Sequence, residues 1–196
     1  MVNYCYKEEL RFTGELIVPI GLPGSGKSTH RTKLQARYGP RFKVISPDEI
    51  RMCLLDYEKT GKSFDESIEP IVWKFAYHYL QNAMYDKTAI IYFDATNLTH
   101  KKRQVLLDMA NANGFKTRAI VFQCPLWLAM MRNKSRKRKV PDNVISQMAT
   151  IMTMPNEEGF SIFEICVMEP TPKERSIIAK YCCQQKNKQA SDPLEE

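Results

Sequence analysis

The stretch GLPGSGKST, residues 21 to 29, has the residue types and spacing of a phosphate-binding loop. Glycines let the backbone turn successive N–H groups toward one point, and the helix that follows adds the positive end of its dipole. Lys27 would neutralise the outer phosphates of a nucleoside triphosphate, and the Ser28 hydroxyl would bind Mg²⁺. The predicted ATP-binding residues are Gly21, Leu22, Pro23, Gly24, Ser25, Gly26, Lys27, Ser28 and Thr29.

The stretch ISPDEIR places an acid and an arginine, Asp48 and Arg51, three residues apart at the start of a predicted helix. Ser46, Pro47 and Glu49 form a capping pattern, so helix-start chemistry explains those three residues without a function. A carboxylate at the carboxyl end of a strand can accept the proton of an attacking hydroxyl, and a neighbouring arginine can bind an acceptor phosphate. We predict that Asp48 is a general base and that Arg51 contacts the acceptor.

The hydrophobic run IIYFDATN delivers a third acid, Asp94, to the same edge of the predicted sheet. An acid in this place binds Mg²⁺ directly or through water, and its alternative role is to cap the following loop. Thr96 and Asn97 suit loop capping as well, and Thr96 is assigned to the acceptor side of the site. The predicted metal ligands are therefore Ser28 and Asp94.

The run RNKSRKRKVP, residues 132–141, holds six cations, which account for all but one unit of the net charge of +7. A solvated basic face, a nucleic-acid patch and a working lid all have this composition. Arg132, Arg136 and Lys139 are spaced to share one helical face, which predicts a lid with Arg132 and Arg136 turned toward a transferring phosphate. The other cations are predicted to face solvent or a nucleic-acid backbone: Lys134, Lys137 and Arg138.

Strand-like runs alternate with helical patterns along the chain, which predicts an α/β fold with a central parallel sheet flanked by helices. The predicted strands are Glu15–Ile20, Phe42–Ile45, Thr88–Phe93, Arg118–Gln123 and Glu164–Met168. The predicted helices are Lys27–Tyr38, Pro47–Leu55, Asp65–Asp86, Thr99–Asn113 and Pro125–Met131, with a further helix just past Pro141.

Two local expectations accompany these elements. Pro19 removes a ladder donor from the first strand, so an irregularity is predicted there. In the third helix an apolar set recurs at helical spacing and is predicted to be buried: Ile68, Ile71, Val72, Phe75, Tyr79, Leu80 and Ala83. Trp73 on the same helix is predicted to pack rather than to stack on a base.

Length and composition predict one globular domain. The chain has 196 residues, of which 43% are hydrophobic, enough for one core. No apolar run is long enough to span a membrane, and the first residues carry acids, so a cytoplasmic protein is expected. The six cysteines show neither metal-site nor disulfide spacing. We predict an N-terminal extension (1–14), one domain (15–170) and a C-terminal helix with a frayed tail (171–196).

In chain order, GLPGSGKST, SPDEIR, DATNLTHKKR and RNKSRKRKVP resemble the motifs of the P-loop 5′-hydroxyl polynucleotide kinases, typified by the bacteriophage T4 enzyme. The resemblance covers about residues 15 to 170. It implies a P-loop NTPase fold like that of adenylate kinase, with a hinged lid over the donor phosphates. It also implies ATP and Mg²⁺ as cofactors and a nucleic acid, DNA or RNA, as acceptor.

The resemblance also implies roles for single residues. Lys27 and Ser28 would contact the donor phosphates and Mg²⁺, Asp48 would be the general base, and Arg51 would bind the acceptor's 3′ phosphate. One departure is that the phage enzyme has its acid directly before Thr-Asn, whereas here an alanine follows Asp94.

The lid and the residues after it have counterparts in the same family. Arg132 and Arg136 resemble the arginines that reach the transferring phosphate. Val140 and Val144 stand where similar enzymes pack against the terminal base of the acceptor. The resemblance therefore predicts that both the donor and the acceptor side of the site include residues from this part of the chain.

Kinases of other hydroxyls share this four-part pattern. Alternatives are a kinase of 5-hydroxymethyluracil in phage DNA, small-metabolite kinases, toxin-type sugar-nucleotide kinases and, in another class, a non-enzymatic ATP-binding module. Surplus cations favour a nucleic-acid acceptor, and Asp48 as a candidate base argues against the non-enzymatic module. Neither the guanine motif N-K-x-D nor the phosphatase motif D-x-D-G-T is present. The sequence thus predicts transfer of the γ-phosphate of ATP to a 5′-hydroxyl.

Overall fold

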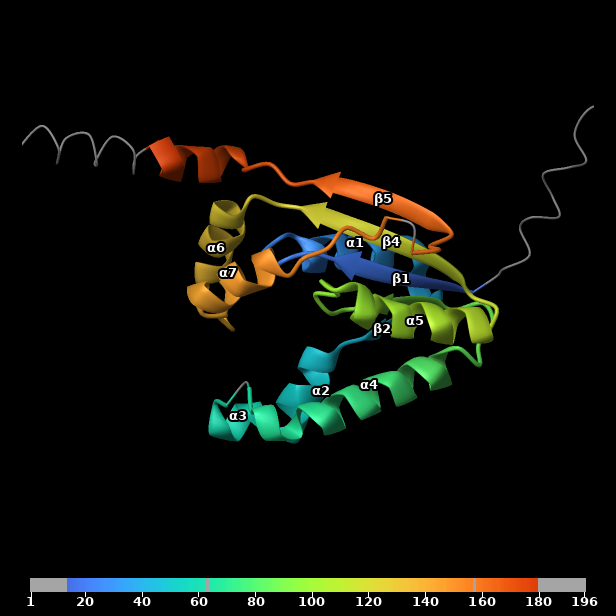
Figure 1. Ribbon diagram of the computed structural model, residues 1–196. Coiled ribbons are helices and arrows are strands. Elements are labelled where there is room, and N and C mark those ends of the chain that lie inside the picture. The colour runs from blue at the N-terminus through green and yellow to red at the C-terminus, as the bar shows by residue number, and fades with distance from the viewer. Residues whose placement is uncertain (1–13, 63, 157, 180–196) are drawn as a thin grey trace, which may run out of the picture.

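The chain folds around a five-stranded sheet, as seen in a computed structural model that describes residues 14–62, 64–156 and 158–179 (Figure 1). All neighbouring strands are parallel, in the order β2-β3-β1-β4-β5. The strands are β1 (Glu15–Ile20), β2 (Phe42–Ile45), β3 (Ile90–Phe93), β4 (Lys116–Gln123) and β5 (Ile162–Val167). The predicted α/β fold with a parallel sheet is confirmed.

Helices cover both faces of the sheet. They are α1 (Lys27–Tyr38), α2 (Pro47–Leu54), α3 (Tyr57–Thr60), α4 (Glu69–Ala83), α5 (His100–Ala112), α6 (Leu126–Lys134) and α7 (Asp142–Thr150). Residues of α4 and α5 pack on one face in a cluster with Leu16 and Val18, whereas Leu34 of α1 packs on the other face with Ile17. The short helix α3 was not predicted, and the predicted helix 65–86 begins instead as a 3₁₀ turn, Glu66–Ile68.

The irregularity predicted at Pro19 is a separation of β1 from its neighbour β3. Pairing of β1 with β3 ends at Ile17, although β1 stays paired with β4 to its last residue. Asn97 joins the strands beyond that point, since its side-chain nitrogen donates to the carbonyls of Pro19 (2.8 Å) and Phe93 (3.2 Å). The two strands therefore diverge toward the sheet edge where the phosphate-binding loop begins.

The apolar stripe predicted to be buried on α4 is buried only in part. One row contacts the sheet, and its members are fully buried: Val72, Ala76 and Leu80. The next row is exposed by 40 to 48%: Ile71, Phe75 and Tyr79. The prediction of a fully buried stripe was wrong because α4 meets the sheet through one row spaced four residues apart, which is narrower than its apolar surface.

The basic run, predicted as a helical lid, is mostly a loop, although α6 extends three residues past the predicted helix end at Met131. Helix α6 ends at Lys134, and residues 135–141 form a loop before α7, which we call the basic loop. Asn133 closes its base: its side-chain nitrogen donates to the Val140 carbonyl (2.7 Å), and its oxygen accepts from the Val140 N–H (3.1 Å). The single helical face predicted for three cations is therefore wrong: Arg132, Arg136 and Lys139.

Residues 172–179 are helical, in the part of the chain where a C-terminal helix was predicted (Figure 1). The predicted tail with Cys182 and Cys183 lies outside the described residues, as do residues 1–13 of the predicted extension. Within the described ranges, none of the helices is both long and apolar enough to cross a membrane.

Candidate active site

A large cleft is lined by residues that follow β1, β2 and β3. In Figure 1, α6 and α7 lie on one side of these strand ends and α2 and α3 lie on the other. The volume of the cleft is about 2080 Å³. The predicted site residues that line it are Pro23, Gly24, Gly26, Lys27, Ser28, Thr29, Asp48, Arg51, Asp94, Thr96, Arg132, Arg136, Val140 and Val144. The remaining three, Gly21, Leu22 and Ser25, are buried in the loop behind it. A pocket of about 330 Å³ beside β2 and α2 contains none of these residues.

Glycine is required at two positions of the phosphate-binding loop. Gly24 and Gly26 have φ values of 82° and 95°, which side-chain-bearing residues rarely adopt. A Cβ on Gly24 would collide with the backbone carbonyl of Ala129, and one on Gly26 would lie 2.6 Å from the terminal methyl of Met168. The loop is therefore pressed against α6 and the segment after β5.

The two helices that face each other across the cleft begin differently. Helix α2 is capped by Ser46, whose hydroxyl accepts from the Glu49 N–H at 3.2 Å, and it carries acids in its first turn. Helix α1 has Gly26 at its N-cap, no side-chain cap and no acid in its first turn. Because the first N–H groups of a helix have no acceptor within the helix, α1 presents donors and a positive dipole end to an anion.

Lys27 lies at the base of the loop and is 9% exposed. Its ammonium donates to the carbonyls of Gly21 (2.8 Å) and Leu22 (2.7 Å). Burial lowers the pKa of Lys27 to about 8, an effect that nearby Asp94 opposes. The buried Ser25 hydroxyl lacks a hydrogen-bond partner among the described residues. A buried cation held only by neutral carbonyls, beside open N–H groups, fits the phosphates of a nucleotide.

Asp94 follows β3 and reaches the loop from the neighbouring strand. Its carboxylate accepts from Arg31 at 2.6 Å. Burial raises the pKa of Asp94, while the cations of Arg31 and Lys27 oppose that rise. Ser28 and Thr96 line the cleft beside it. A hydroxyl and a carboxylate are hard oxygen ligands, and they fit a Mg²⁺ ion that takes its other ligands from phosphate and water.

Arg31 is a site residue that sequence reasoning missed. It lies 26% exposed on α1 and pairs with Asp94 at 2.6 Å and, more loosely, with Glu49 at 3.5 Å. Its signal was present in the sequence, because it stands four residues after Lys27 and so lies on the same face of the helix.

Two arginines hold the carboxylate of Asp48 on the opposite wall. Oδ1 accepts from Arg51 Nη1 at 2.5 Å, and Oδ2 pairs with Arg138 Nη1 at 2.9 Å. Arg51 is buried, and its other two nitrogens bind the Glu69 carboxylate at 2.5 and 2.9 Å. Arg138 was predicted to face outward, and that was wrong: its side chain is only 23% exposed and reaches across the cleft from the basic loop.

The two arginines predicted to reach the transferring phosphate are in different situations. Arg132 forms two hydrogen bonds with the Glu174 carboxylate, at 2.8 and 3.0 Å, and donates to the Glu169 carbonyl. Arg136 is exposed, lines the cleft and, within the described ranges, pairs with no carboxylate. Its charge contributes to lowering the pKa of Lys27, after burial and against the effect of Asp94. Arg136 is therefore available to an anion without rearrangement, whereas Arg132 must first leave Glu174.

The apolar side of the cleft is built from α7 and α4. Val140, Val144 and Met148 line it on the side of the basic loop. Trp73 lines it from α4 and, as predicted, packs: its ring stacks on Phe93 with centroids 6.4 Å apart. These side chains give the cleft apolar surface beside its charged groups.

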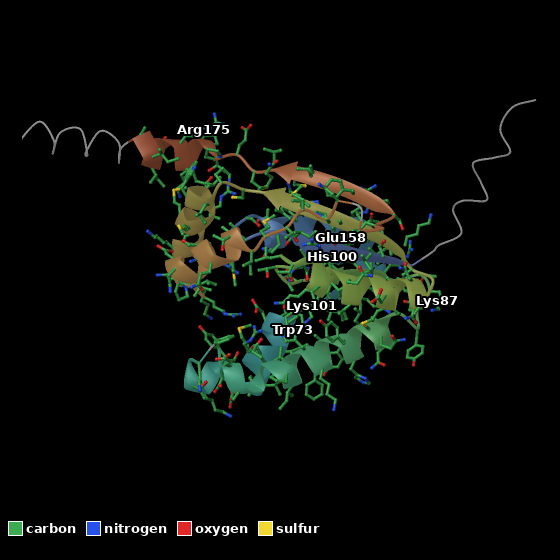
Figure 2. All side chains as sticks on the ribbon, viewed as in Figure 1. Trp73, Lys87, His100, Lys101, Glu158 and Arg175 are labelled. Atoms are coloured by element: carbon green, nitrogen blue, oxygen red, sulfur yellow. The ribbon has the colours of Figure 1, made fainter. Side chains whose placement is uncertain are left out.

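The stretch THKKR that follows this site stabilises the fold. Arg103 is fully buried and donates to Glu158 Oε2 at 2.7 Å, to Thr153 Oγ1 at 2.9 Å and to the Asn97 carbonyl at 2.9 Å. His100 Nδ1 lies 3.2 Å from Glu158, and Figure 2 shows the two side chains next to each other at the start of α5. This network holds the loop after β3, which carries Asp94, against α5.

Comparison with known proteins gives a family match and shows similarity to a curated kinase sequence. The family AAA_33, an AAA domain, matches residues 16–155. Over 136 residues the chain is 29% identical to the L-seryl-tRNA(Sec) kinase of Methanococcus maripaludis, which covers 68% of this chain and 50% of that protein. The chain thus spans about half the length of the curated relative it matches.

Solved structures share the fold at low sequence identity. The structure of the Pnkp1/Rnl/Hen1 RNA repair complex matches with a TM-score of 0.59 and 17% identity, over 74% of this chain and 46% of that chain. A gluconokinase from Sinorhizobium meliloti matches with a TM-score of 0.55 and 15% identity, over 93% and 99% of the two chains. A gluconokinase and a chain of an RNA repair complex therefore share this fold.

Proposed function

We propose a function from the premise that this chain belongs to the AAA_33 family of AAA domains and is a P-loop phosphotransferase. Kinases of this class use ATP with Mg²⁺. Our proposal is that the chain transfers the γ-phosphate of ATP to the 5′-hydroxyl of a DNA or RNA acceptor. It extends to the residue roles: Lys27, Ser28 and the loop bind the donor, and Asp48 accepts the proton.

One observation carries the proposal: the cleft brings an uncapped helix N-terminus with a buried lysine opposite a carboxylate held by two arginines. The side of the cleft with Lys27 and the N-terminus of α1 suits a triphosphate, and the side with Asp48 suits a hydroxyl that must lose a proton. An adaptor that only binds ATP would have no use for the side with Asp48.

Three features support a polynucleotide acceptor over a small one. The cleft of about 2080 Å³, which includes the donor side, has room for more than a nucleotide, because a single small ligand is usually enclosed in several hundred Å³. Lys137 and Lys139 lie exposed at its border, where a phosphate backbone would be attracted. The names of two similar proteins refer to an RNA-linked substrate and to RNA repair.

In the proposed mechanism the acceptor oxygen attacks the γ-phosphorus in line with the leaving group. The hydroxyl proton passes to the Asp48 carboxylate as the new O–P bond forms. The bond from the γ-phosphorus to the β–γ bridging oxygen breaks, and ADP leaves with that oxygen. Lys27 and the N–H groups at the start of α1 hold the phosphates, and Arg136 stabilises the transferring group. Mg²⁺, which Ser28 and Asp94 would hold, supplies further charge neutralisation.

The test uses γ-labelled ATP, Mg²⁺ and paired oligonucleotides, DNA and RNA, with either a 5′-hydroxyl or a 5′-phosphate. We expect label on the 5′-hydroxyl strands and none on the phosphorylated ones, and loss of more than about 100-fold of the transfer rate in Asp48→Asn with ATP binding retained. Near-normal turnover of Asp48→Asn would overturn the assigned base.

Parallel reactions compare the alternative acceptors. They contain seryl-tRNA, a hydroxymethyluracil duplex with blocked ends, and gluconate. If one of these acceptors is labelled and the 5′-hydroxyl strands are not, the protein is a kinase of that acceptor instead. Absence of label on every acceptor, with ATP bound, would favour the non-enzymatic module.

A further inference from the structure

Arg138 is the feature of the cleft that the motifs do not explain. It belongs to the basic loop, yet its guanidinium meets Asp48 of α2 at 2.9 Å, a contact between segments 90 residues apart in the sequence. Its neighbours Lys137 and Lys139 are exposed, and neither forms an ion pair within the described ranges. One cation of the run therefore points across the cleft, toward the proposed proton acceptor.

Both ends of this contact are anchored. On the loop side, the Asn133 side chain forms two hydrogen bonds with the backbone of Val140, which closes the loop two residues after Arg138. On the opposite side, Asp48 is held by Arg51, and Arg51 is held in turn by Glu69. The Asp48 side chain is 54% exposed, but anchoring of both groups reduces the loss of side-chain freedom that makes most surface pairs ineffective.

We propose that Arg138 is a positioning residue that orients the Asp48 carboxylate for proton acceptance and does so only when the basic loop lies over the cleft. An ionised carboxylate has about four acceptor positions, so two arginine contacts leave room for the acceptor hydroxyl. Closure of the basic loop over the donor phosphates would thereby also orient the Asp48 carboxylate to accept the proton. The proposal rests on the proposed function, because it takes Asp48 as the base.

The kinetic test compares Arg138→Gln, Arg138→Lys and, as a control from the same run, Lys134→Gln. Lys134 is 71% exposed, pairs only loosely with Asp142 at 3.7 Å and does not line the cleft. We expect Arg138→Gln to lower kcat roughly tenfold while the KM for ATP changes less than about twofold. Arg138→Lys should recover most of kcat, because one N–H contact carries the pair, and Lys134→Gln should leave kcat unchanged.

A second test needs no acceptor. The basic loop is rich in trypsin sites, so its cleavage rate in the folded chain reports how firmly it is held. Asp48→Asn removes the ion pair and leaves every trypsin site in place; we expect cleavage within residues 134–139 to be roughly two- to fivefold faster than in the wild type. Glu49→Gln removes one charge from the same helix and should leave the rate unchanged.

The outcomes separate the two proposals. Equal kcat in Arg138→Gln and the wild type, or equal cleavage of the Asp48→Asn and wild-type loops, would overturn the role of Arg138. If the wild type labels no polynucleotide, the proposed acceptor is wrong. The proteolysis result then still decides whether Arg138 holds the loop to Asp48, and kcat is measured on the acceptor that is labelled.

Discussion

At the scale of single residues, each of the two acids proposed for the site is paired with an arginine of the cleft. Asp94 is paired with Arg31 and Asp48 with Arg138, while Lys27 is bound to carbonyls of its own loop. Because these partners lie within the cleft, binding of substrates exchanges contacts rather than creating them from solvated side chains. The pairs orient the proposed metal ligand Asp94 and the proposed base Asp48 before ATP arrives, although the Asp48 side chain stays 54% exposed.

Lys27 gives a pH prediction at this scale. Burial lowers its pKa from 10.5 to about 8, so between those values the unfolded chain holds more protons than the folded chain. Lys27 therefore makes stability rise with pH through that window. Relative to Lys27→Met, the free energy of unfolding of the wild type should increase by up to roughly 3 kcal/mol between pH 7 and pH 10.5. Urea unfolding of both proteins across this range measures it, and a pH-independent difference would contradict it.

At the scale of elements, the site depends on how segments begin and end. Because α2 is capped by a side chain and α1 is not, α1 is the helix proposed to bind the phosphates. The separation of β1 from β3 at their carboxyl ends sets the distance between the phosphate-binding loop, which follows β1, and Asp94, which follows β3. The buried side-chain amide of Asn97 bridges the separated strand ends through its hydrogen bonds to Pro19 and Phe93. The backbone φ of Asn97 is 48°.

Substitutions of Asn97 test this bridge between the ends of β1 and β3. Asn97→Ala leaves the Pro19 and Phe93 carbonyls without their side-chain donor and keeps an unfavourable φ, so we expect a loss of about 2–3 kcal/mol of unfolding free energy. Asn97→Gly loses the same amide but tolerates the φ, and should be about 1 kcal/mol more stable than the alanine variant. Urea unfolding measures both, and an alanine variant within about 0.5 kcal/mol of the wild type would refute the role.

At the scale of the whole molecule, the C-terminal helix is coupled to the donor site. Glu174 binds Arg132, whose hydrogen bonds hold the pKa of that carboxyl well below its usual range. Glu174 also caps its own helix, since it accepts from the Thr171 N–H at 2.7 Å. The helix at residues 172–179 therefore holds Arg132, one of the proposed lid arginines, in an ion pair with Glu174.

This coupling predicts the effect of freeing Arg132. Glutamine preserves a capping box but carries no charge, so Glu174→Gln should keep the helix and release Arg132. If Arg132 contacts ATP, the Kd for ATP should fall roughly two- to fivefold. Glu169→Gln is the matched control, because Glu169 pairs through its side chain with exposed Arg175 instead. Isothermal titration measures the Kd, and equal values for the two variants would contradict the coupling.

The sequence by itself determined the phosphate-binding loop and most of the fold. Helix α1, β1 and β2 have the predicted bounds, because glycine spacing, apolar runs and capping residues are local signals. The same local signals placed Asp48 and Asp94 at one sheet edge and Arg136 in a lid, and all three residues line the cleft.

Only the tertiary structure decided which charges meet. The sequence assigned Arg138 to solvent and Arg132 to phosphate, yet one pairs with Asp48 and the other with Glu174. The partners in each pair are distant in sequence, and the periodicity of apolar residues along one segment does not predict which side chains of another segment it contacts. Likewise the end of α6 at Lys134 depends on the clamp between Asn133 and Val140. Local propensity specifies elements, but ion pairing across a cleft depends on packing that the whole chain must complete.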